Sequence, residues 1–374
     1  MTEAEAMFGN PGSLHAEGVQ ARALLEGARE GVAHELACKA RQVIFTSGLT
    51  ESINLAILGF ARKLAIRGTD LSKTHWITTS IEHASVLDSF GEVERLGGNV
   101  TFVEPDARGL ILPEALQRTM RENTVFISIG WGNNEIGTVQ KMSDLSRVIH
   151  GHRESIIFHT DAGQAPLYRT PHVHTLGVDM LSLGAGKLYG PRSSGVLFVR
   201  EPEGLAPIIL GGGQENGLRS GTENVIPAIG CAKALELIAR ERAPEAKRLE
   251  KMRDTFAQEI EKKIGGILIN GSLKHSLPHM LNISIPGERS GEYLALALDH
   301  AGIALSTKSA CNEGEAASHV VAALGGESWR AVNTLRFSFG RDTTAREIAR
   351  AAEILGKSFR LDCSAGVIGC PYGH

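Results

Sequence analysis

The stretch Leu181-Ser-Leu-Gly-Ala-Gly-Lys187-Leu-Tyr-Gly-Pro191 joins a short apolar run to a glycine-rich turn. An apolar run bounded by turn residues is typical of a buried strand. The turn that follows carries a lysine, Lys187. The stretch therefore predicts a strand in a buried sheet with a lysine delivered at its carboxyl end.

Further strand-like runs lie on both sides of this stretch, with helical segments between several of them. Helical spacing of apolar residues extends over 18–39 and recurs over 53–64. Strands that alternate with helices indicate a mostly parallel sheet covered on both faces, which is an α/β fold. The predicted strands cover residues 43–46, 76–79, 100–103, 125–129, 156–159, 180–183 and 196–199.

The character of the sequence changes after Asn224. A helical stretch over 225–242 is followed by a charged segment over 245–263, and we place a domain boundary near residue 245. The remainder indicates a smaller α+β domain, with a loosely ordered tail over 363–374. Its expected elements are strands at 267–269, 281–285, 301–305 and 335–339 and a helix over about 345–355.

The composition is that of an ordinary globular protein. Lys and Arg total 39 against 42 Asp and Glu, so no basic excess points to nucleic acid or to an anionic membrane. No apolar run approaches a membrane span and no signal peptide is evident, so we expect a cytoplasmic protein. The 5 cysteines are an odd, sparse set that predicts neither a disulfide framework nor a zinc finger.

Lys187 is the first candidate for chemistry. We expect its delivery from an apolar strand to desolvate the amine partly, which lowers its pKa and makes it available for a Schiff base. A surface lysine in a loop is the alternative. The turn is not a phosphate-binding Walker motif, because Leu181 and Leu188 occupy positions where that motif has Gly and Ser or Thr.

Two polar residues follow the predicted strand at 156–159. Asp161 and Gln164 would emerge at the carboxyl end of a parallel strand, where ligands bind. An acid there can pair with a protonated ring nitrogen, and a helix N-cap is the alternative. Upstream, Ser47-Gly-Leu-Thr50 lies between a strand and a helix and offers backbone N–H groups and a hydroxyl to a phosphate.

A third set of candidates lies in the C-terminal part. Cys311 follows an apolar run in a polar segment near Lys308, where a nearby cation favours a reactive thiolate. Arg336 could emerge from a strand as a bidentate carboxylate clamp or serve as a surface salt-bridge partner. The other cysteines suggest no metal centre: Cys38 and Cys231 indicate inert buried thiols, and Cys363 and Cys370 lack a ligand pattern.

Nine segments, in order along the chain, resemble the cysteine desulfurases of the NifS/IscS type, which are class V aminotransferase-family, fold-type I pyridoxal-phosphate enzymes. The resemblance covers about residues 8–358. The segments are Phe8-Gly-Asn-Pro-Gly-Ser-Leu-His15, Phe45-Thr-Ser-Gly-Leu-Thr-Glu-Ser52, Glu82-His83, Asn133-Asn-Glu-Ile-Gly137, Asp161-Ala-Gly-Gln164, Lys187-Leu-Tyr-Gly-Pro191, Gly211-Gly-Gly-Gln-Glu-Asn-Gly-Leu-Arg-Ser-Gly-Thr222, Ser309-Ala-Cys311 and Leu335-Arg-Phe-Ser-Phe-Gly340.

The resemblance implies a fold and a division into domains. The fold is that of a fold-type I pyridoxal-phosphate transferase, with a mostly parallel seven-stranded sheet in a large cofactor-binding domain and a smaller α+β domain. We expect the large domain at 13–244 and the small domain at 1–12 and 245–374.

The resemblance also implies residue roles. Lys187 would carry pyridoxal 5′-phosphate, Asp161 would pair with the ring nitrogen, and His83 would stack on the ring. The remaining assignments are Gln164 to the ring hydroxyl, Leu49 and Thr50 to the phosphate, Thr222 to the phosphate of a neighbouring subunit in a homodimer, Asn134 to cofactor and substrate, Arg336 to the substrate carboxylate, and Cys311 to the transferred sulfur.

The implied reaction converts L-cysteine to L-alanine and leaves the sulfur as a persulfide on Cys311. The persulfide would pass to an iron-sulfur scaffold or another acceptor protein. Two alternatives stay open: selenocysteine lyase or another class V lyase, and a cofactor-binding scaffold without activity. Ser309-Ala-Cys311 favours the desulfurase.

Two departures from the family pattern carry expectations. The family's Asn-Asn-Ala-Thr-Thr-Pro segment is absent before Phe8, so we expect a truncated chain, a misassigned start or impaired catalysis. Gly184 and Gly186 replace the family's Ser and His beside the cofactor. We expect weaker cofactor retention, partial recovery in Gly184→Ser, and less recovery in Gly186→His, because imidazole needs room.

Overall fold

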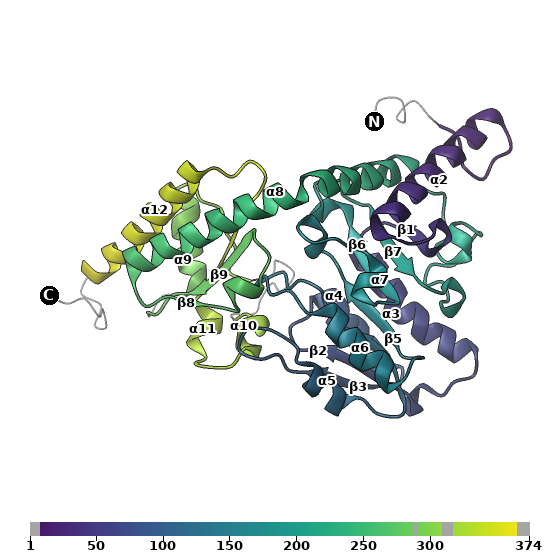
Figure 1. Ribbon diagram of the computed structural model, residues 1–374, viewed down its shortest axis with the longest axis horizontal. Coiled ribbons are helices and arrows are strands. Elements are labelled where there is room, and N and C mark those ends of the chain that lie inside the picture. Colours follow the sequence, from purple (N-terminus) through teal and green to yellow (C-terminus); the bar gives the residue numbers. More distant parts are fainter. Residues whose placement is uncertain (1–7, 288–289, 309–316, 365–374) are drawn as a thin grey trace. The chain divides into compact units, whose positions relative to one another are not determined.

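The computed structural model describes residues 8–287, 290–308 and 317–364 (Figure 1). The chain divides into two compact units. The first unit comprises the described residues up to 103 together with 112–131 and 141–242. The second unit comprises 104–111, 132–140 and the described residues from 243 onward. The loops at 104–111 and 132–140 thus belong to the same unit as the C-terminal part of the chain.

The first unit contains a seven-stranded sheet in the order β1-β7-β6-β5-β4-β2-β3. Strands β6, β5, β4, β2 and β3 are parallel to one another, which confirms the α/β fold with a mostly parallel sheet. The strands are β1 (Val43–Thr46), β2 (His75–Thr79), β3 (Asn99–Val103), β4 (Thr124–Ser128), β5 (Ile157–Asp161), β6 (Met180–Gly184) and β7 (Gly195–Val199).

Strand β7 is the exception to the parallel order, since it runs antiparallel to both β6 and β1. The connection from β6 to β7 contains only a short 3-10 turn, η4 (Ala185–Lys187), and no crossover helix. A parallel neighbour needs such a crossover, whereas a short connection reverses the chain. The Lys187 turn is therefore the reversal between two neighbouring strands.

Helices cover the sheet, and their ends follow from local chemistry. Helix α2 (Ala16–Leu36) begins where the His15 side chain accepts from the Gly18 N–H, and it ends at Ala37, which adopts a left-handed conformation (φ 54°). The other helices of this unit are α3 (Leu49–Ile66), α4 (Ala84–Arg95), α5 (Pro113–Thr119), α6 (Met142–His152), α7 (Val173–Leu176) and the first part of α8 (Val225–Ile264).

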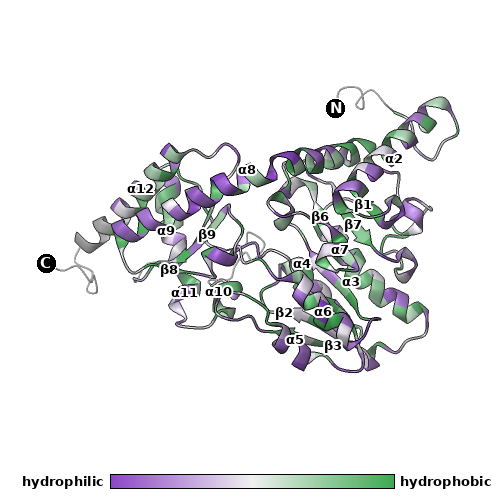
Figure 2. Cartoon of the chain, in the orientation of Figure 1, coloured by the Kyte–Doolittle hydropathy of each residue, from purple (hydrophilic) through white to green (hydrophobic). Residues whose placement is uncertain are grey.

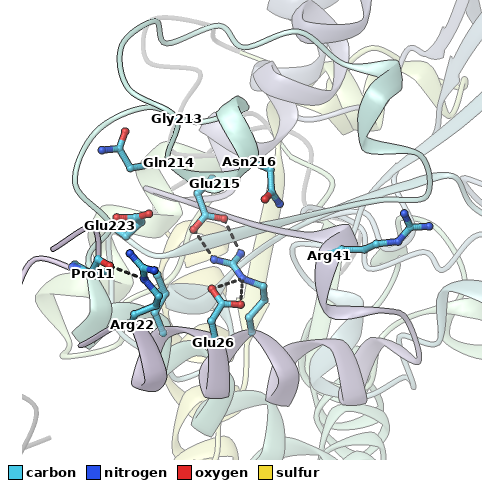
Figure 3. A pocket seen from close by; sticks show the side chains of 12 residues that line it. Pro11, Arg22, Glu26, Arg41, Gly213, Gln214, Glu215, Asn216 and Glu223 are labelled. Carbon is cyan, nitrogen blue, oxygen red and sulfur yellow. Dashed lines mark hydrogen bonds and ion pairs between the residues drawn. The ribbon is translucent and has the colours of Figure 1, made fainter. Parts of the chain in front are cut away.

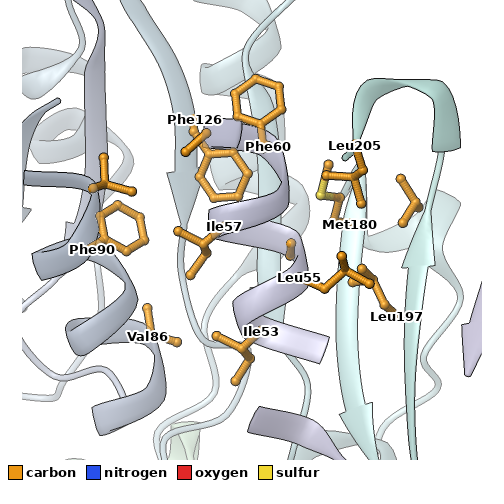
Figure 4. Close-up of a cluster of buried hydrophobic side chains, with 14 of the residues drawn as sticks. Ile53, Leu55, Ile57, Phe60, Val86, Phe90, Phe126, Met180, Leu197 and Leu205 are labelled. Carbon is orange, nitrogen blue, oxygen red and sulfur yellow. The ribbon is translucent and has the colours of Figure 1, made fainter. Parts of the chain in front are cut away.

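Helix α3 supplies the centre of the first unit's core. Figure 4 shows Ile57 of α3 directed toward Phe90 of α4, while Leu55 is directed toward Leu197 of β7. All four side chains are buried. Because apolar residues occur on two sides of α3, the helix packs on the sheet and on α4 together.

A row of polar side chains crosses the same sheet nearer its carboxyl edge. The His159 ring on β5 bonds through Nδ1 to Ser128 Oγ at 2.8 Å and through Nε2 to Ser182 Oγ at 2.9 Å. All three residues are fully buried. Burial lowers the pKa of His159 to about 3, so the ring is neutral and joins three adjacent strands.

The second unit contains a three-stranded antiparallel sheet, β10-β9-β8, formed by β8 (Leu268–Ile269), β9 (Met280–Ser284) and β10 (Thr334–Ser338). The expected strand at 301–305 is absent, and only Ser306 forms an isolated bridge, with Arg336. The helices are α9 (Gly291–His300), α10 (His319–Ala323), α11 (Trp329–Val332) and α12 (Ala345–Ser364).

Two helices are longer than the sequence pattern predicts. Helix α8 (Val225–Ile264) continues through Pro244, although proline removes one backbone N–H from a helix. Hydrophilic and hydrophobic residues mix along α8 in Figure 2, so its charged second half still buries Leu249 and Phe256. Helix α12 extends to Ser364 and includes Cys363, where we expected the tail to begin.

No helix among the described residues is both long enough and apolar enough to cross a bilayer.

Candidate active site

Lys187 lies in the turn η4 directly after β6. Lys187 is exposed, so the prediction that its amine is partly desolvated is wrong. The physical reason is local: Gly184 and Gly186 place no side chains beside the amine, and Ala185 turns inward. The chain nevertheless holds the lysine at the edge where the parallel strands end.

Asp161 ends β5 at that same edge. Burial raises the pKa of the Asp161 carboxyl, while the Gly163 N–H at 2.7 Å and the electrostatic influence of His83 and Lys187 lower it. The Asp161 carbonyl accepts the Trp131 N–H at 2.9 Å. Electrostatic influence of this kind requires proximity, so three of the predicted site residues lie together.

His83 precedes α4 and caps it. The ring Nδ1 accepts the Ser85 N–H at 3.1 Å and lies 2.8 Å from Ser85 Oγ. Since Nδ1 is an acceptor for a backbone donor, the other ring nitrogen carries the proton in the neutral form. The cap therefore fixes both the tautomer and the ring orientation.

Glu82 is a residue that the sequence analysis did not assign. Its carboxyl is 5% exposed, accepts the Thr79 hydroxyl at 2.7 Å, and takes the Gly130 N–H on both oxygens at 3.0 Å. Burial and the nearby Asp161 raise the pKa of Glu82 to about 7. The feature of the sequence that could have indicated Glu82 is an acidic residue directly before His83, shortly after an apolar predicted strand.

The start of α3 offers an anion site at the other end of this edge. Gly48 precedes the helix without a side-chain cap, so the first backbone N–H groups of α3 have no capping acceptor. Leu49 and the exposed Thr50 are the first two helical residues. A methyl group at Gly163 would lie 2.5 Å from Leu49 Cδ2, which shows how closely the Asp161 turn approaches this helix.

The space at the two unusual glycines bears on our expectation about them. A Cβ at Gly184 would lie 2.9 Å from Leu49 Cβ and 3.2 Å from Leu49 N, so a serine there has no room. A Cβ at Gly186 would lie 3.7 Å from Arg192 Cα, which is ordinary contact. This crowding argues against the expected recovery of cofactor retention in Gly184→Ser, because Leu49 at the start of α3 already fills the position. The comparison with Gly186→His stays a prediction.

The segment that carries Thr222 is anchored beside α3. Arg219 forms an ion pair with Glu51, one residue after Thr50, at 2.9 Å. Thr222 itself is exposed. Gln164 is half-buried and directly precedes the turn η3 (Ala165–Leu167), three residues beyond Asp161.

A cavity of about 640 Å³ lies between α2 and the turn that precedes this segment. Figure 3 shows Glu26 and Glu215 joined to one guanidinium, that of Arg29, which is buried and bidentate to Glu215 at 2.7 and 2.8 Å. The Phe45 N–H also donates to Glu215 at 2.9 Å. These contacts attach the turn at 215–217 to β1.

Arg336 and Asn134 lie together in the second unit. Arg336 Nη1 donates to the Asn134 carbonyl at 2.9 Å, and its buried Nε has no hydrogen-bond partner. Burial lowers the pKa of Arg336, and the Glu135 carboxylate opposes that shift. Within the described ranges, no carboxylate forms an ion pair with Arg336, so its guanidinium suits an incoming carboxylate.

The cysteines separate into two groups. Cys311 and Cys370 lie outside the described residues. Burial raises the pKa of Cys38 to about 11 and that of Cys231 to about 12, which agrees with inert thiols. Cys38 lies just after α2 rather than inside it.

The first-unit residues fit pyridoxal phosphate. Asp161 offers a carboxyl group at a strand end, Lys187 offers an accessible amine, and the uncapped start of α3 suits a phosphate. Gly184 lets the Lys187 turn approach the start of α3 closely, since a Cβ there would lie 2.9 Å from Leu49 Cβ. Acid, amine and anion site thus occur along one sheet edge.

Comparisons with known proteins identify the family of the chain. The family model described as aminotransferase class-V matches residues 1–351. A cysteine desulfurase IscS of Dictyoglomus turgidum is 39% identical over 349 residues, which cover 93% of this chain and 86% of that protein. A cysteine desulfurase IscS 1 of Archaeoglobus fulgidus is 38% identical and covers 93% of this chain and 89% of its own length.

Solved structures give the same result. A NifS-like protein superposes with a TM-score of 0.88 at 33% identity, over 95% of this chain and 93% of its own. SspA in complex with cysteine superposes with a TM-score of 0.77 at 33% identity, over 90% and 94% of the two chains.

Proposed function

Since the chain belongs to the class V aminotransferase family and is a pyridoxal-phosphate-dependent cysteine desulfurase, we propose that Lys187, Asp161 and Cys311 carry its reaction. The supporting observation is the cluster of Asp161, His83 and Lys187 at the carboxyl edge of the sheet. SspA, a relative of known structure, is described in complex with cysteine, and L-cysteine is the substrate here.

Each residue of the first unit has a defined task. The cofactor, when bound, supplies an electron sink for a substrate carbanion. Lys187 would hold it and, as a free amine, would take the proton from the substrate Cα. Asp161 would pair with the protonated ring nitrogen, and His83, whose orientation is set by Ser85, would lie against the ring. Leu49 and Thr50 would bind the phosphate with the first N–H groups of α3, and Gln164 would donate to the ring hydroxyl.

Arg336 and Asn134 bind the amino-acid end of the substrate. The unpartnered Nε–H of Arg336 donates to the α-carboxylate. The Cys311 thiolate then attacks the substrate sulfur: an S–S bond forms, the Cβ–S bond breaks, and protonation of the carbon leaves L-alanine and a Cys311 persulfide. The sulfur is not lost to solvent, so an acceptor protein is the expected next partner.

The test maps the cofactor and the sulfur separately. Borohydride-reduced protein should carry the phosphopyridoxyl group on Lys187, and Lys187→Ala should lose it. Cys311→Ser should still give the cofactor's spectral response to L-cysteine but no persulfide by mass spectrometry. Label on another lysine, or persulfide on Cys363 or Cys370 alone, contradicts the assignment.

The alternatives are not favoured. The curated relatives are named cysteine desulfurases rather than selenocysteine lyases. The cofactor-binding scaffold without activity would retain Lys187 labelling but form no L-alanine from L-cysteine, which the same experiment measures.

We also propose a homodimer in which Thr222 serves the phosphate site of the second copy. The first unit exposes large apolar side chains that a partner would cover, with Phe8 96%, Leu14 91% and Leu210 66% exposed. Sedimentation should give a dimer. A monomer with full cofactor occupancy would exclude this role of Thr222.

The sulfur acceptor that we propose is an iron-sulfur scaffold or another thiol-accepting protein. The compartment is the cytoplasm, because persulfide chemistry on Cys311 needs a reduced thiol. Sulfur-35 transferred from loaded enzyme to a candidate scaffold measures this step.

A further inference from the structure

Two described residues flank the segment that carries Cys311, and both are bonded to the region of Arg336. Ser306 lies five residues before Cys311 and exchanges two backbone hydrogen bonds with Arg336, at 2.6 and 3.3 Å. Ser318 lies seven residues after Cys311, and its N–H donates to the Ala331 carbonyl at 2.9 Å. Of the described residues on either side of Cys311, Ser306 thus pairs with β10 and Ser318 lies at the start of α10.

The return end has an additional bond through its side chain. Ser318 Oγ donates to Glu135 Oε2 at 2.6 Å, and the two residues are 1% and 0% exposed. A short O–H···O bond to a carboxylate is among the stronger hydrogen bonds in proteins. Glu135 follows Asn134, whose carbonyl holds Arg336. One turn therefore contacts both the carboxylate clamp and the end of the Cys311 segment.

The turn itself is rigidly held. Asn133 Oδ1 accepts the N–H groups of Glu135 and Ile136 at 2.8 and 2.9 Å, and the Glu135 carbonyl accepts Asn282 Nδ2 at 3.1 Å. A movement of Ser318 is consequently opposed by the β9 strand as well as by Glu135.

A helix cap alone does not account for this arrangement. Ser318 Oγ accepts the Val321 N–H at 3.1 Å and caps α10, which needs only an acceptor. Capping does not require a buried carboxylate behind the serine, and burying such a group has a free-energy cost. The Glu135 contact therefore has a purpose beyond α10.

We propose that Glu135 and Ser318 are positioning residues that hold the return end of the Cys311 segment to the turn supporting Arg336. This inference rests on the proposed function, in which Arg336 binds the substrate carboxylate and Cys311 takes the sulfur. Ser306 and Ser318, the described residues on either side of Cys311, both attach close to Arg336. The attachment points of the Cys311 segment are therefore fixed relative to the residue that binds the substrate carboxylate.

The test uses the full-length holoenzyme with Ser318→Ala. Single-turnover persulfide formation on Cys311 should slow by about ten-fold, and proteolytic cleavage between residues 306 and 318 should accelerate by about ten-fold, the size expected for one lost hydrogen bond to a charged group. Cofactor content and absorbance should stay unchanged. Ser318→Thr, which retains the hydroxyl, should restore both rates.

Ser290→Ala is the matched control. Ser290 caps α9 in the same unit by accepting the Tyr293 N–H at 3.3 Å. If its loss slows persulfide formation as much as Ser318→Ala does, general destabilisation explains the effect and the proposal fails. Wild-type rates in Ser318→Ala also overturn it.

The two proposals fail differently. If the wild type forms no persulfide on Cys311, the proposed function is wrong. The proteolysis measurement does not depend on turnover. An unchanged cleavage rate in Ser318→Ala contradicts the proposed role of the Ser318–Glu135 hydrogen bond, and an accelerated rate supports it.

Discussion

Two buried polar networks support the two groups of site residues, and they differ in chemistry. In the first unit, His159 links Ser128 and Ser182 beneath the strand ends that carry Asp161 and Lys187. In the second unit, Asn282 Oδ1 accepts from Asn270 and Thr334 at 2.7 Å, and Asn282 Nδ2 donates to the Glu135 carbonyl. The first network depends on a titratable ring and the second on amides and hydroxyls.

The difference follows from the two sheets. Parallel strands bring their carboxyl ends to one edge, so a row across three strands supports residues at that edge. The antiparallel sheet of the second unit presents no such edge, and its network instead attaches a loop, 132–140, to strand β9. The cofactor residues therefore depend on strand register, whereas the carboxylate clamp depends on loop anchoring.

The largest expected effect comes from a change in the first group. Asp161→Asn should lower kcat by about 10²–10³-fold, because the amide no longer stabilises a protonated ring nitrogen. Cofactor absorbance and the kinetics of L-alanine formation measure it.

The corresponding change in the second group should affect substrate binding without affecting cofactor binding. Arg336→Gln should leave cofactor content intact and weaken binding of L-cysteine and L-alanine by about 100-fold, since the carboxylate loses its charged partner. Spectral titration with L-alanine gives the Kd. Loss of cofactor in Arg336→Gln would contradict a division of labour between the groups.

Glu82→Gln should remove a pH dependence of stability. The pKa of Glu82 rises from 4.5 to about 7 on folding, so the folded state binds the proton more tightly and stability falls as pH rises from about 4.5 to 7. The wild type should lose about 3 kcal/mol from this group across that window, and the variant should not. Urea unfolding with saturating cofactor at several pH values measures it.

Glu51→Gln is the control for that measurement. The Arg219 and Ser47 contacts overcome burial and lower the pKa of Glu51, so its contribution is lost only as pH falls below 4.5. Between pH 5 and 8, the free energy of unfolding of Glu51→Gln should change with pH as it does in the wild type. If both variants lost the pH dependence of stability equally, Glu82 would not be its cause.

The two glycines should respond unequally. Gly184→Ala places a Cβ against Leu49 and should cost about 1–3 kcal/mol of stability and weaken phosphate binding. Gly186→Ala, at an open position, should change stability by less than about 0.5 kcal/mol. Thermal unfolding and a cofactor-binding isotherm distinguish them, and equal losses would refute the steric account.

The smallest expected effect is a difference between the His159 network and the Asn282 network in how stability depends on pH. His159 is held neutral with a pKa of about 3 against 6.5 unfolded, so stability falls as pH decreases below 6.5. From pH 7.5 to 5.5, wild type should lose about 1.4 kcal/mol more than His159→Gln. Asn282→Ala should lower stability by a similar amount at both pH values. A pH-dependent loss in Asn282→Ala would show that the networks do not differ in this way.

The sequence alone determined the α/β class, the seven strands and the candidates Lys187 and Asp161, because strand periodicity and glycine turns are local properties. It also carried the family motifs. The sequence pattern predicts the end of a helix near residue 242 because a charged segment follows, whereas helix α8 continues to Ile264 and buries Phe256.

Only the tertiary structure decided features that depend on distant partners. Exposure of Lys187, the lack of room at Gly184 and the raised pKa of Glu82 each depend on neighbours that folding brings together. The bond from Ser318 to Glu135 joins residues 183 positions apart. Local sequence determines where a strand ends and which side chain leaves it, while packing across the fold determines the space, charge and partners that the side chain meets there.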